Sequence, residues 1–188
     1  MTTTEVQATP ESALPSTSVQ TPDGIFSIIA GHSAVLASGW TADLQSLELL
    51  IHPSLRSIGD PGLAPTSTRY EDPSADVVLS QAVKAVRQYY DGDLTAISAV
   101  PVHQKSGPFR QKAWDALREV GPGKPVTYRE YAAATGSPTA ARAAAAACAM
   151  NAAALFVPCH RVIRSDGTLG GFRYGLPLKQ DLLLRESR

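Results

Sequence analysis

The sequence predicts a small α/β domain followed by a mainly helical domain of the winged-helix or helix-turn-helix type. Residues 23–103 contain two apolar runs with strand character and one amphipathic helix, whereas residues 104–188 contain a pair of helices joined by a glycine-containing turn. The charge changes at the same place. Residues 1–103 carry four Lys/Arg against eleven Asp/Glu, and residues 104–188 carry thirteen against six. A basic part of this kind is typical of a surface that faces a polyanion.

The general composition predicts a globular protein without a secretory signal or a membrane-spanning run. The chain has 188 residues, a net charge of zero and 44% apolar residues, which is enough to bury a core. Residues 1–22 are rich in Ser, Thr and Pro and lack Lys, Arg and an apolar core, so they predict a disordered tail and not a secretory signal. No apolar run approaches membrane-spanning length. We expect a soluble protein of a reducing compartment, cytoplasmic or, in a eukaryote, nuclear.

Cysteine and histidine are too few and too scattered for a metal centre. The only cysteines are Cys148 and Cys159, which excludes a disulfide framework and a four-cysteine zinc cluster. The four histidines lack the spacing of metal ligands. We expect no metal and no cofactor.

The first elements are expected to be strands. Residues 24–30 and 34–40 have the composition of two strands, and residues 31–33 form the turn between them. Residues 44–51 are a short apolar helix or strand. The Pro/Gly/Ser-rich stretch 53–68 is a loop.

A longer helix and a further strand complete the first domain. Apolar residues near helical spacing predict a helix that Ser74 caps and Gly92 ends. Residues 96–102 are expected to be a strand, at the edge of the sheet if Pro101 lies within it. None of these segments carries visible chemistry.

The basic part begins with an amphipathic helix over residues 109–120. A second helix over residues 128–135 is broken by Gly-Ser-Pro. Ser137 is suited to cap a third helix, with Pro138 in its first turn, that runs to residue 150. Two helices joined by a short turn form the helix-turn-helix pattern of many DNA-binding proteins. The alternative is that the alanine-rich third helix is low-complexity filler.

The segment LFVPCHRVIR, residues 155–164, places Cys159 directly before His160. A thiolate is a strong nucleophile, and a histidine can take the thiol proton, directly or through a water, if a carboxylate fixes its tautomer. Pro158 disfavours helix before it, and a sharp turn would let both side chains face one pocket. The acidic candidates for the third group are Asp166, Asp181 and Glu186. The alternative is a buried inert cysteine next to a surface histidine, which the basic flank and the glycine-rich SDGTLGGFRYG do not favour.

These motifs resemble the O6-alkylguanine-DNA alkyltransferases. PCHRV carries the resemblance together with NAAALFV ahead of it, GTLGGFRYGL behind it, and the glutamate of LLRES 27 residues after the cysteine. The upstream pattern PF..KAW..L..V..G..VTY.E.A...G.P.AAR extends it over about residues 109–187, whereas the first domain matches only in size and element order. The resemblance implies direct reversal of DNA damage by a single-turnover methyltransferase. An alkyl group passes irreversibly from O6-alkylguanine, or O4-alkylthymine, in duplex DNA to the protein after base flipping.

The resemblance also assigns catalytic roles. Cys159 corresponds to the alkyl acceptor, His160 to the histidine that draws the thiol proton through a bound water, and Glu186 to the carboxylate that orients this histidine. Asn151 corresponds to the residue that ties the recognition helix to the active-site segment. Tyr128 corresponds to the tyrosine that hydrogen-bonds the guanine and can supply a proton to it.

Contacts with DNA and with the damaged base follow from the same resemblance. Arg142 corresponds to the arginine that replaces the extruded base in a duplex bound through its minor groove. A helix of alanines suits contact that is indifferent to sequence, because its short side chains let the backbone approach the DNA closely. The other expected DNA contacts are Ala141, Ala145, Thr127 and Arg161. The expected substrate-pocket residues are Val162, Gly170, Phe172, Arg173 and Tyr174.

The chain departs from the family pattern at two places. Ala152 and Ala154 stand where prolines are usual, and we expect a looser segment with an entropy effect of about 0.4–1 kcal/mol at each site. Ala145 and Ala146 replace a frequent Gly-Gly pair, which affects DNA affinity more than chemistry. Some relatives carry an N-terminal zinc site, which we do not expect because no cysteine precedes position 148.

Other classes of function predict different features. A binder of alkylated guanine without chemistry would have tryptophan in place of Cys159. A Cys-His hydrolase would turn over and would not need a helix-turn-helix. A transcription regulator would not need the cysteine, and a fused regulator would need a second DNA-binding module. We expect a monomer in solution whose partner is alkylated duplex DNA, with no membrane contact, and cooperative assembly on DNA is an open alternative.

Overall fold

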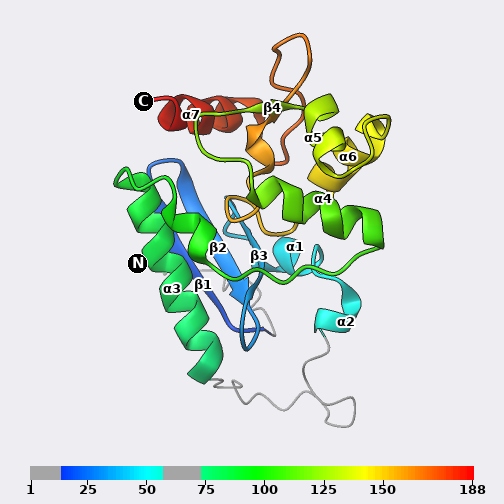
Figure 1. Cartoon of the computed structure of the whole chain (residues 1–188). Helices are drawn as coiled ribbons and strands as arrows, with labels where there is room; N and C mark the ends of the chain where they lie inside the picture. The colour runs from blue at the N-terminus through cyan, green and yellow to red at the C-terminus, as the bar shows by residue number, and fades with distance from the viewer. Residues whose placement is uncertain (1–13, 57–72) are drawn as a thin grey trace, which may run out of the picture.

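The computed structural model describes residues 14–56 and 73–188 (Figure 1). In chain order, the elements are β1 (Ser16–Thr21), β2 (Gly24–Ala30), β3 (Val35–Gly39), α1 (Leu44–Glu48), α2 (Pro53–Arg56), α3 (Pro73–Tyr90), the 3-10 helix η1 (Ala96–Ala99), α4 (Pro108–Arg118), β4 (Val126–Thr127), α5 (Tyr128–Ala134), α6 (Ala141–Ala149), the 3-10 helix η2 (Cys159–Arg161), β5 (Val162–Ile163) and α7 (Leu176–Glu186). Within these two ranges, no helix combines the length and the apolar character needed to cross a membrane.

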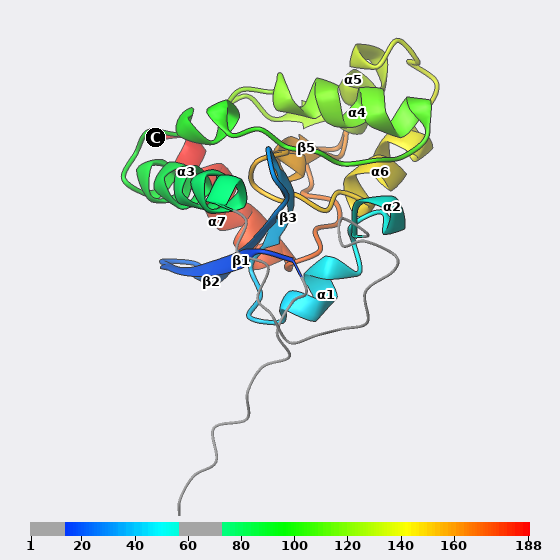
Figure 2. The ribbon, with the colours of Figure 1, turned by 90° about the horizontal axis from the view of Figure 1, so that it is seen from below.

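The N-terminal part is a three-stranded antiparallel sheet with the order β1-β2-β3. Successive side chains of a strand point to opposite faces, and here both faces of β2 are covered. Phe26, Ile28 and Ala30 belong to the hydrophobic cluster on the side of α3, whereas Ile29 belongs to the cluster that contains Leu47 of α1. Seen from below, α3 and α1 lie on opposite sides of the sheet (Figure 2).

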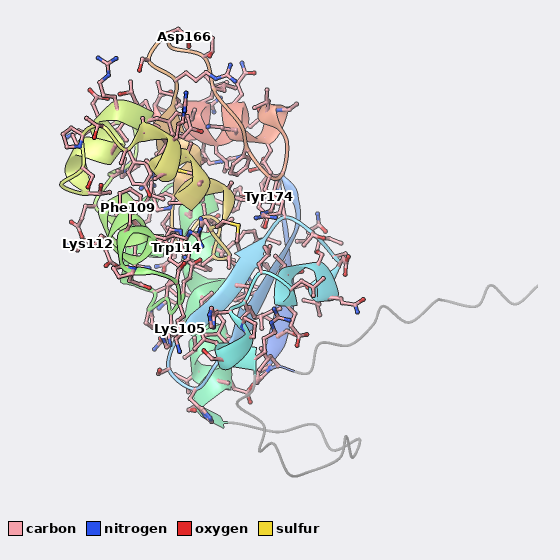
Figure 3. The ribbon with its side chains drawn as sticks, turned by 90° about the vertical axis from the view of Figure 1, so that its right-hand side faces the viewer. Lys105, Phe109, Lys112, Trp114, Asp166 and Tyr174 are labelled. Carbon is pink, nitrogen blue, oxygen red and sulfur yellow. The ribbon has the colours of Figure 1, made fainter. Side chains whose placement is uncertain are left out.

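The C-terminal part consists of α4–α7 and the short parallel pair β4–β5, and it occupies the upper half of Figure 1. Helix α4 is amphipathic, and its Trp114 donates from Nε1 to the Ala147 carbonyl of α6 at 2.9 Å (Figure 3). The core continues into the N-terminal part, since the rings of Phe26 and Phe156 lie edge to face with centroids 6.2 Å apart. One hydrophobic core therefore contains residues of both parts.

Strand β3 is joined to the segment that precedes Cys159. The Ser38 amide donates to the Ala152 carbonyl at 2.9 Å, and the Ala154 amide donates to the Ser38 carbonyl at 3.1 Å. The Ser38 hydroxyl donates to the Ala154 carbonyl at 2.7 Å, and Ser38 is fully buried. The sheet thus supplies a parallel backbone partner to residues 152–154.

Several predictions for the N-terminal part are confirmed and others are wrong. The strands at 24–30 and 34–40 are present, and residues 44–48 are helix. The tail prediction fails at β1, because the β-branched residues of Ser16–Thr21 pair along their whole length with β2. The rest of the tail, residues 1–13, lies outside the described residues.

The connections differ from expectation at two places. The predicted loop at 53–68 begins with the helical turn α2, and residues 57–72 lie outside the described residues. Residues 96–99 of the predicted strand 96–102 are instead the 3-10 helix η1, which buries Ile97. Val100, just after this helix, is also buried in the core, and Val102 alone forms a bridge to Val35. Local turn chemistry decides this, because Asp93 accepts from the amide of Thr95 and starts a turn.

Helix ends also deviate. Helix α3 begins at Pro73, so Ser74 lies within its first turn. The Ser137 carbonyl accepts from the Ala140 amide in a turn, and α6 begins only at Ala141, without a side-chain cap. Helix α7 has no counterpart among the predicted elements.

Candidate active site

A cavity of about 550 Å³ lies in the C-terminal part, between α6, the segment around η2 and the loop that precedes α7. Most of its walls are small or aromatic side chains. The lining residues are Tyr128, Ala145, Cys148, Ala149, Asn151, Ala154, Cys159, Arg164, Gly170, Gly171, Phe172, Arg173 and Tyr174. The cavity thus contains the predicted acceptor cysteine together with several residues that were assigned to the substrate pocket.

Cys159 is the first residue of η2 and is only partly exposed. Asn151 holds this segment in place, because its Nδ2 donates to the Val157 carbonyl at 2.8 Å and to the Cys159 sulfur at 3.3 Å. Its Oδ1 accepts from the Ala153 amide at 3.1 Å and from Gln104 Nε2 at 3.0 Å. The predicted tie between the end of α6 and the active-site segment is therefore present as hydrogen bonds.

His160 and Glu186 are both fully buried and form a pair, with Nε2 and Oε1 2.9 Å apart. The other two acidic candidates lie elsewhere. Asp166 is exposed at the outer end of its loop (Figure 3), where it accepts from Thr168. Asp181 is exposed on α7. Of the three carboxylates, only Glu186 contacts the histidine.

Glu186 is buried and accepts hydrogen bonds from three residues, namely His160, Arg161 and Tyr89. Arg161 donates from Nε to Oε2 and from Nη2 to Oε1, each at 2.8 Å, and Tyr89 donates to Oε1 at 2.9 Å. Burial alone would raise the pKa of Glu186, but the hydrogen bonds from His160 and Arg161 lower this pKa to about 2. The carboxylate is therefore ionised throughout the physiological range.

The ionised carboxylate fixes the tautomer of His160. We assign the ring proton to Nε2, because an acceptor-only carboxylate faces that atom. Nδ1 is then an acceptor, and it is buried without a hydrogen-bond partner among the described residues. Burial lowers the pKa of His160, although the hydrogen bond to Glu186 works against this. A neutral imidazole with a free Nδ1 lone pair can take up a proton.

The thiol of Cys159 stays protonated until a base removes its proton. Burial raises its pKa, and the hydrogen bond from Asn151 and the positive charges of Lys179 and Arg173 oppose this increase. Lys179 is itself buried, and its ammonium donates to the carbonyls of Val162 and Gly171 at 2.6 and 3.3 Å. Lys179 thus holds the loop before α7 and supplies a positive charge that favours the thiolate.

Tyr128 is the first residue of α5 and forms one wall of the cavity. The helix starts with a capping box in which Thr127 Oγ1 accepts from the Glu130 amide and Glu130 Oε2 accepts from the Thr127 amide. Opposite the ring lies Gly170 at φ +68°, where a Cβ would come within 3.1 Å of the Tyr128 ring and hydroxyl. Burial raises the pKa of Tyr128, so its phenol keeps its proton.

The aromatic wall of the cavity packs against strand β3 and the residue that follows it. Tyr174 (Figure 3) donates to the Ser38 carbonyl at 3.3 Å. Its ring packs edge to face on Trp40 and Phe172. A side chain at Gly39 would overlap the Tyr174 hydroxyl, so glycine is required there for this close approach. The ring positions of Phe172 and Tyr174 therefore depend on β3.

Two predicted site residues do not take the assigned positions. Arg161 was expected to contact DNA, but it is 1% exposed and its guanidinium binds Glu186 and the Val120 carbonyl. Val162 was expected in the substrate pocket, but it is fully buried in the core and its carbonyl accepts from Lys179. Arg161, the second residue after the cysteine, thus belongs to an internal ion pair and not to a basic surface.

The remaining predicted DNA contacts surround the start of α6. Arg142 is exposed near the beginning of this helix, Ala141 is its first, half-buried residue, and Ala145 lines the cavity one turn later. Thr127 is partly exposed at the cap of α5. Arg173 projects from the loop and donates from Nη2 to the Ala149 carbonyl at the end of α6, at 2.5 Å. Within residues 14–56 and 73–188, no group of three or more His, Cys, Asp or Glu side chains is arranged to hold a metal ion.

Comparison with known proteins agrees with this geometry. A family model described as "6-O-methylguanine DNA methyltransferase, DNA binding domain" matches residues 108–188. The relative named "Bifunctional transcriptional activator/DNA repair enzyme Ada", from Escherichia coli, is 42% identical over 113 residues, which cover 60% of this chain and 32% of the relative. A relative from Acanthamoeba polyphaga mimivirus, "Probable methylated-DNA--protein-cysteine methyltransferase", is 34% identical over 62% of this chain and 78% of its own length. The chain belongs to the methylated-DNA–protein-cysteine methyltransferase family.

The methyltransferase fold is also shared with a solved structure. The Mycobacterium tuberculosis protein named OGT, solved in complex with DNA, matches this methyltransferase-family chain with a TM-score of 0.69 and 27% identity, over 92% of both chains. The small antiparallel sheet with its helices is thus the fold of the family. The chain spans about a third of the length of the first curated relatives that it matches.

Several residues of the cavity and its surroundings were not predicted from the sequence. Cys148 and Arg164 line the cavity, Gln104 holds Asn151, Lys179 holds the loop, and Tyr89 binds Glu186. A signal existed for Lys179, because it lies seven residues before Glu186 and therefore on the same face of a helix. The contacts of Gln104 and Tyr89 bridge 47 and 97 residues, and no local pattern indicates them.

Proposed function

We propose that this chain repairs alkylated DNA by transferring an alkyl group, in one irreversible step, from O6-alkylguanine or O4-alkylthymine in duplex DNA to Cys159. The observation that carries the proposal is that Cys159 lines a cavity of about 550 Å³, and that the next residue, His160, forms a buried pair with Glu186. A buried, oriented histidine next to a cavity-lining thiol is the arrangement that activates a cysteine nucleophile.

The groups around the cavity account for each step. Glu186 holds the Nε2 proton of His160, and Nδ1 takes the Cys159 proton through a bound water. The sulfur then forms a bond to the alkyl carbon while the bond from this carbon to O6 of guanine breaks. Tyr128 supplies a proton to the guanine, which avoids negative charge on the leaving base. The product is a thioether that no group in the site can hydrolyse, so each molecule reacts once.

Helices α5 and α6 are proposed to act as the helix-turn-helix of a winged-helix unit, residues 104–188, with α6 in the minor groove. The target base must leave the stack at a cost of a few kcal/mol, which damage reduces. Arg142 is exposed near the start of α6 and would fill the gap. The related structure solved with DNA supports DNA as the partner. We also propose that the chain is a monomer in solution. Residues 23–103 would form a domain separate from the winged-helix unit.

Intact-mass spectrometry tests the proposal directly. The protein, mixed with an excess of a duplex that contains one O6-methylguanine, should gain the mass of one methyl group, and peptide mapping should place it on Cys159. With the duplex in tenfold excess, the amount of repaired DNA should equal the amount of protein. Repeated turnover, or a methyl group on another residue, would contradict the mechanism.

Replacement of Arg142 by alanine should slow repair of duplex DNA by about 10- to 100-fold, because the few kcal/mol of unstacking are no longer offset by an inserted side chain. Reaction with free O6-benzylguanine, which needs no flipping, should change little. Single-turnover rate constants for both substrates measure this. An equal loss on both substrates would show that Arg142 does not act in base extrusion.

A further inference from the structure

The Glu186 carboxylate receives a hydrogen bond from the N-terminal part of the chain. Tyr89 is in the last turn of α3, is fully buried, and donates from its hydroxyl to Glu186 Oε1 at 2.9 Å. The same oxygen is 2.9 Å from His160 Nε2 and 2.8 Å from Arg161 Nη2. Tyr89 and His160 therefore share one acceptor atom.

We propose that Tyr89 is a positioning residue for alkyl transfer, which fixes the Glu186 carboxylate from α3 and limits the negative charge that this carboxylate presents to His160. The inference rests on the proposed function for its kinetic consequence, but not for its effect on the histidine. It assigns a part in the reaction to a helix that carries no other residue of the site.

The position of Glu186 explains why an external support is needed. Glu186 is the last residue of α7, and helix ends fray more readily than helix centres. Its neighbour Arg185 also reaches the N-terminal part, since it binds Asp23 at 2.9 Å and lies over the ring of Tyr90, 4.7 Å from the ring centroid. Tyr89 and Tyr90 thus hold the end of α7 through two adjacent contacts, of which only that of Tyr89 reaches the carboxylate.

The charged and titratable groups around His160 determine the direction of the effect. They are Glu186 and Lys179 of α7, Arg161 and Cys159 of η2, and Tyr89 of α3. A donor on the carboxylate draws negative charge away from the bond to the imidazole. Removal of the Tyr89 hydroxyl concentrates this charge on the His160 contact, which stabilises the imidazolium and raises the pKa of His160. His160 must be neutral to act as a base, so activity would be lost at a higher pH during acidification.

The test compares Tyr89→Phe with Tyr90→Phe. Phenylalanine keeps the ring packing of Tyr89 and removes only the hydroxyl. Tyr90 is the matched control, because its hydroxyl bonds to Asp23 and to Trp40, at 2.8 and 3.0 Å, and not to Glu186. Single-turnover methyl transfer is measured from acidic to neutral pH. The acidic midpoint should move to higher pH in Tyr89→Phe and stay in place in Tyr90→Phe. A profile of Tyr89→Phe that is lower at every pH but has the wild-type midpoint would overturn the inference.

A titration without substrate separates this inference from the proposed function. NMR of the His160 ring in protein labelled at histidine should show protonation at higher pH in Tyr89→Phe than in wild type, whether or not methyl transfer occurs. In a Glu186→Gln background the same substitution should have no further effect, because Tyr89 acts through the carboxylate. An unchanged His160 titration in Tyr89→Phe, or an equal shift in both backgrounds, would refute the role.

Discussion

Serine in place of Cys159 should abolish the gain of a methyl group from O6-methylguanine duplex. A hydroxyl is a much weaker acid than a thiol, and a neutral hydroxyl does not displace guanine from carbon. The residues that assist the sulfur, Asn151, Lys179 and Arg173, counter the effect of burial only in part, so they are insufficient for an alkoxide. Intact-mass analysis after long exposure should detect no adduct, whereas the wild-type protein should gain one methyl group.

The second cysteine provides the matched control. Cys148 lines the same cavity as Cys159, but burial raises its pKa strongly, and its sulfur receives no bond from Asn151. Cys148→Ser should therefore still gain one methyl group. Methylation of Cys148 in the Cys159→Ser protein, or loss of transfer in Cys148→Ser alone, would contradict the assignment of Cys159 as the acceptor.

Replacement of Arg161 by methionine should lower the free energy of unfolding by about 3–5 kcal/mol, the range measured when one partner of a buried ion pair is removed. Arg161 makes two hydrogen bonds to Glu186 and both side chains are almost completely buried, so Glu186 would lose its main counter-charge. Urea unfolding, followed by tryptophan fluorescence, measures the change. The pKa of Glu186 is about 2 in the folded state against an ordinary value of 4.5, so its ionised form stabilises the fold fully above pH 4.5. This stabilisation is lost as the pH falls from 4.5 through 2, and the difference between variant and wild type should shrink with it.

Two further variants make the Arg161 result specific. Arg129→Met, at an exposed position of α5, should change stability by no more than about 0.5 kcal/mol. Arg161→Lys keeps the charge but not the bidentate geometry. Its loss of unfolding free energy should therefore lie between those of Arg161→Met and Arg129→Met. If Arg161→Met is as mild as Arg129→Met while DNA binding becomes less dependent on salt, the arginine contacts phosphate and the internal ion pair is not its role.

The sequence predicted the elements whose signals are local. The spacing of apolar residues predicted α3, α4 and α5. The choice of Glu186 among three acidic candidates came from the family resemblance of the cysteine motif, and the structure places its carboxylate 2.9 Å from His160. Strand β1 was missed because its polar composition resembles that of a tail, and its pairing with β2 provides the missing information. Arg161 was misplaced because a run of basic residues does not reveal which of them faces inward.

The support of the site could not be predicted for a different reason. Gln104 and Ser38 form hydrogen bonds to residues 151–154, and Tyr89 forms one to Glu186; all three come from segments that are distant in the sequence. Each has an unremarkable local setting: a connection, a helix end and a strand. Only the packing of the N-terminal part against α7 and residues 152–154 gives them partners.

The bridge between Ser38 and residues 152–154 links two parts of the chain that differ in charge and in chemistry. A one-residue insertion or deletion in β3 would invert the strand face that carries Ser38 and would also bring a side chain to the place of Gly39, against Tyr174. We therefore expect β3 to tolerate no change of length, although none of its residues lines the cavity.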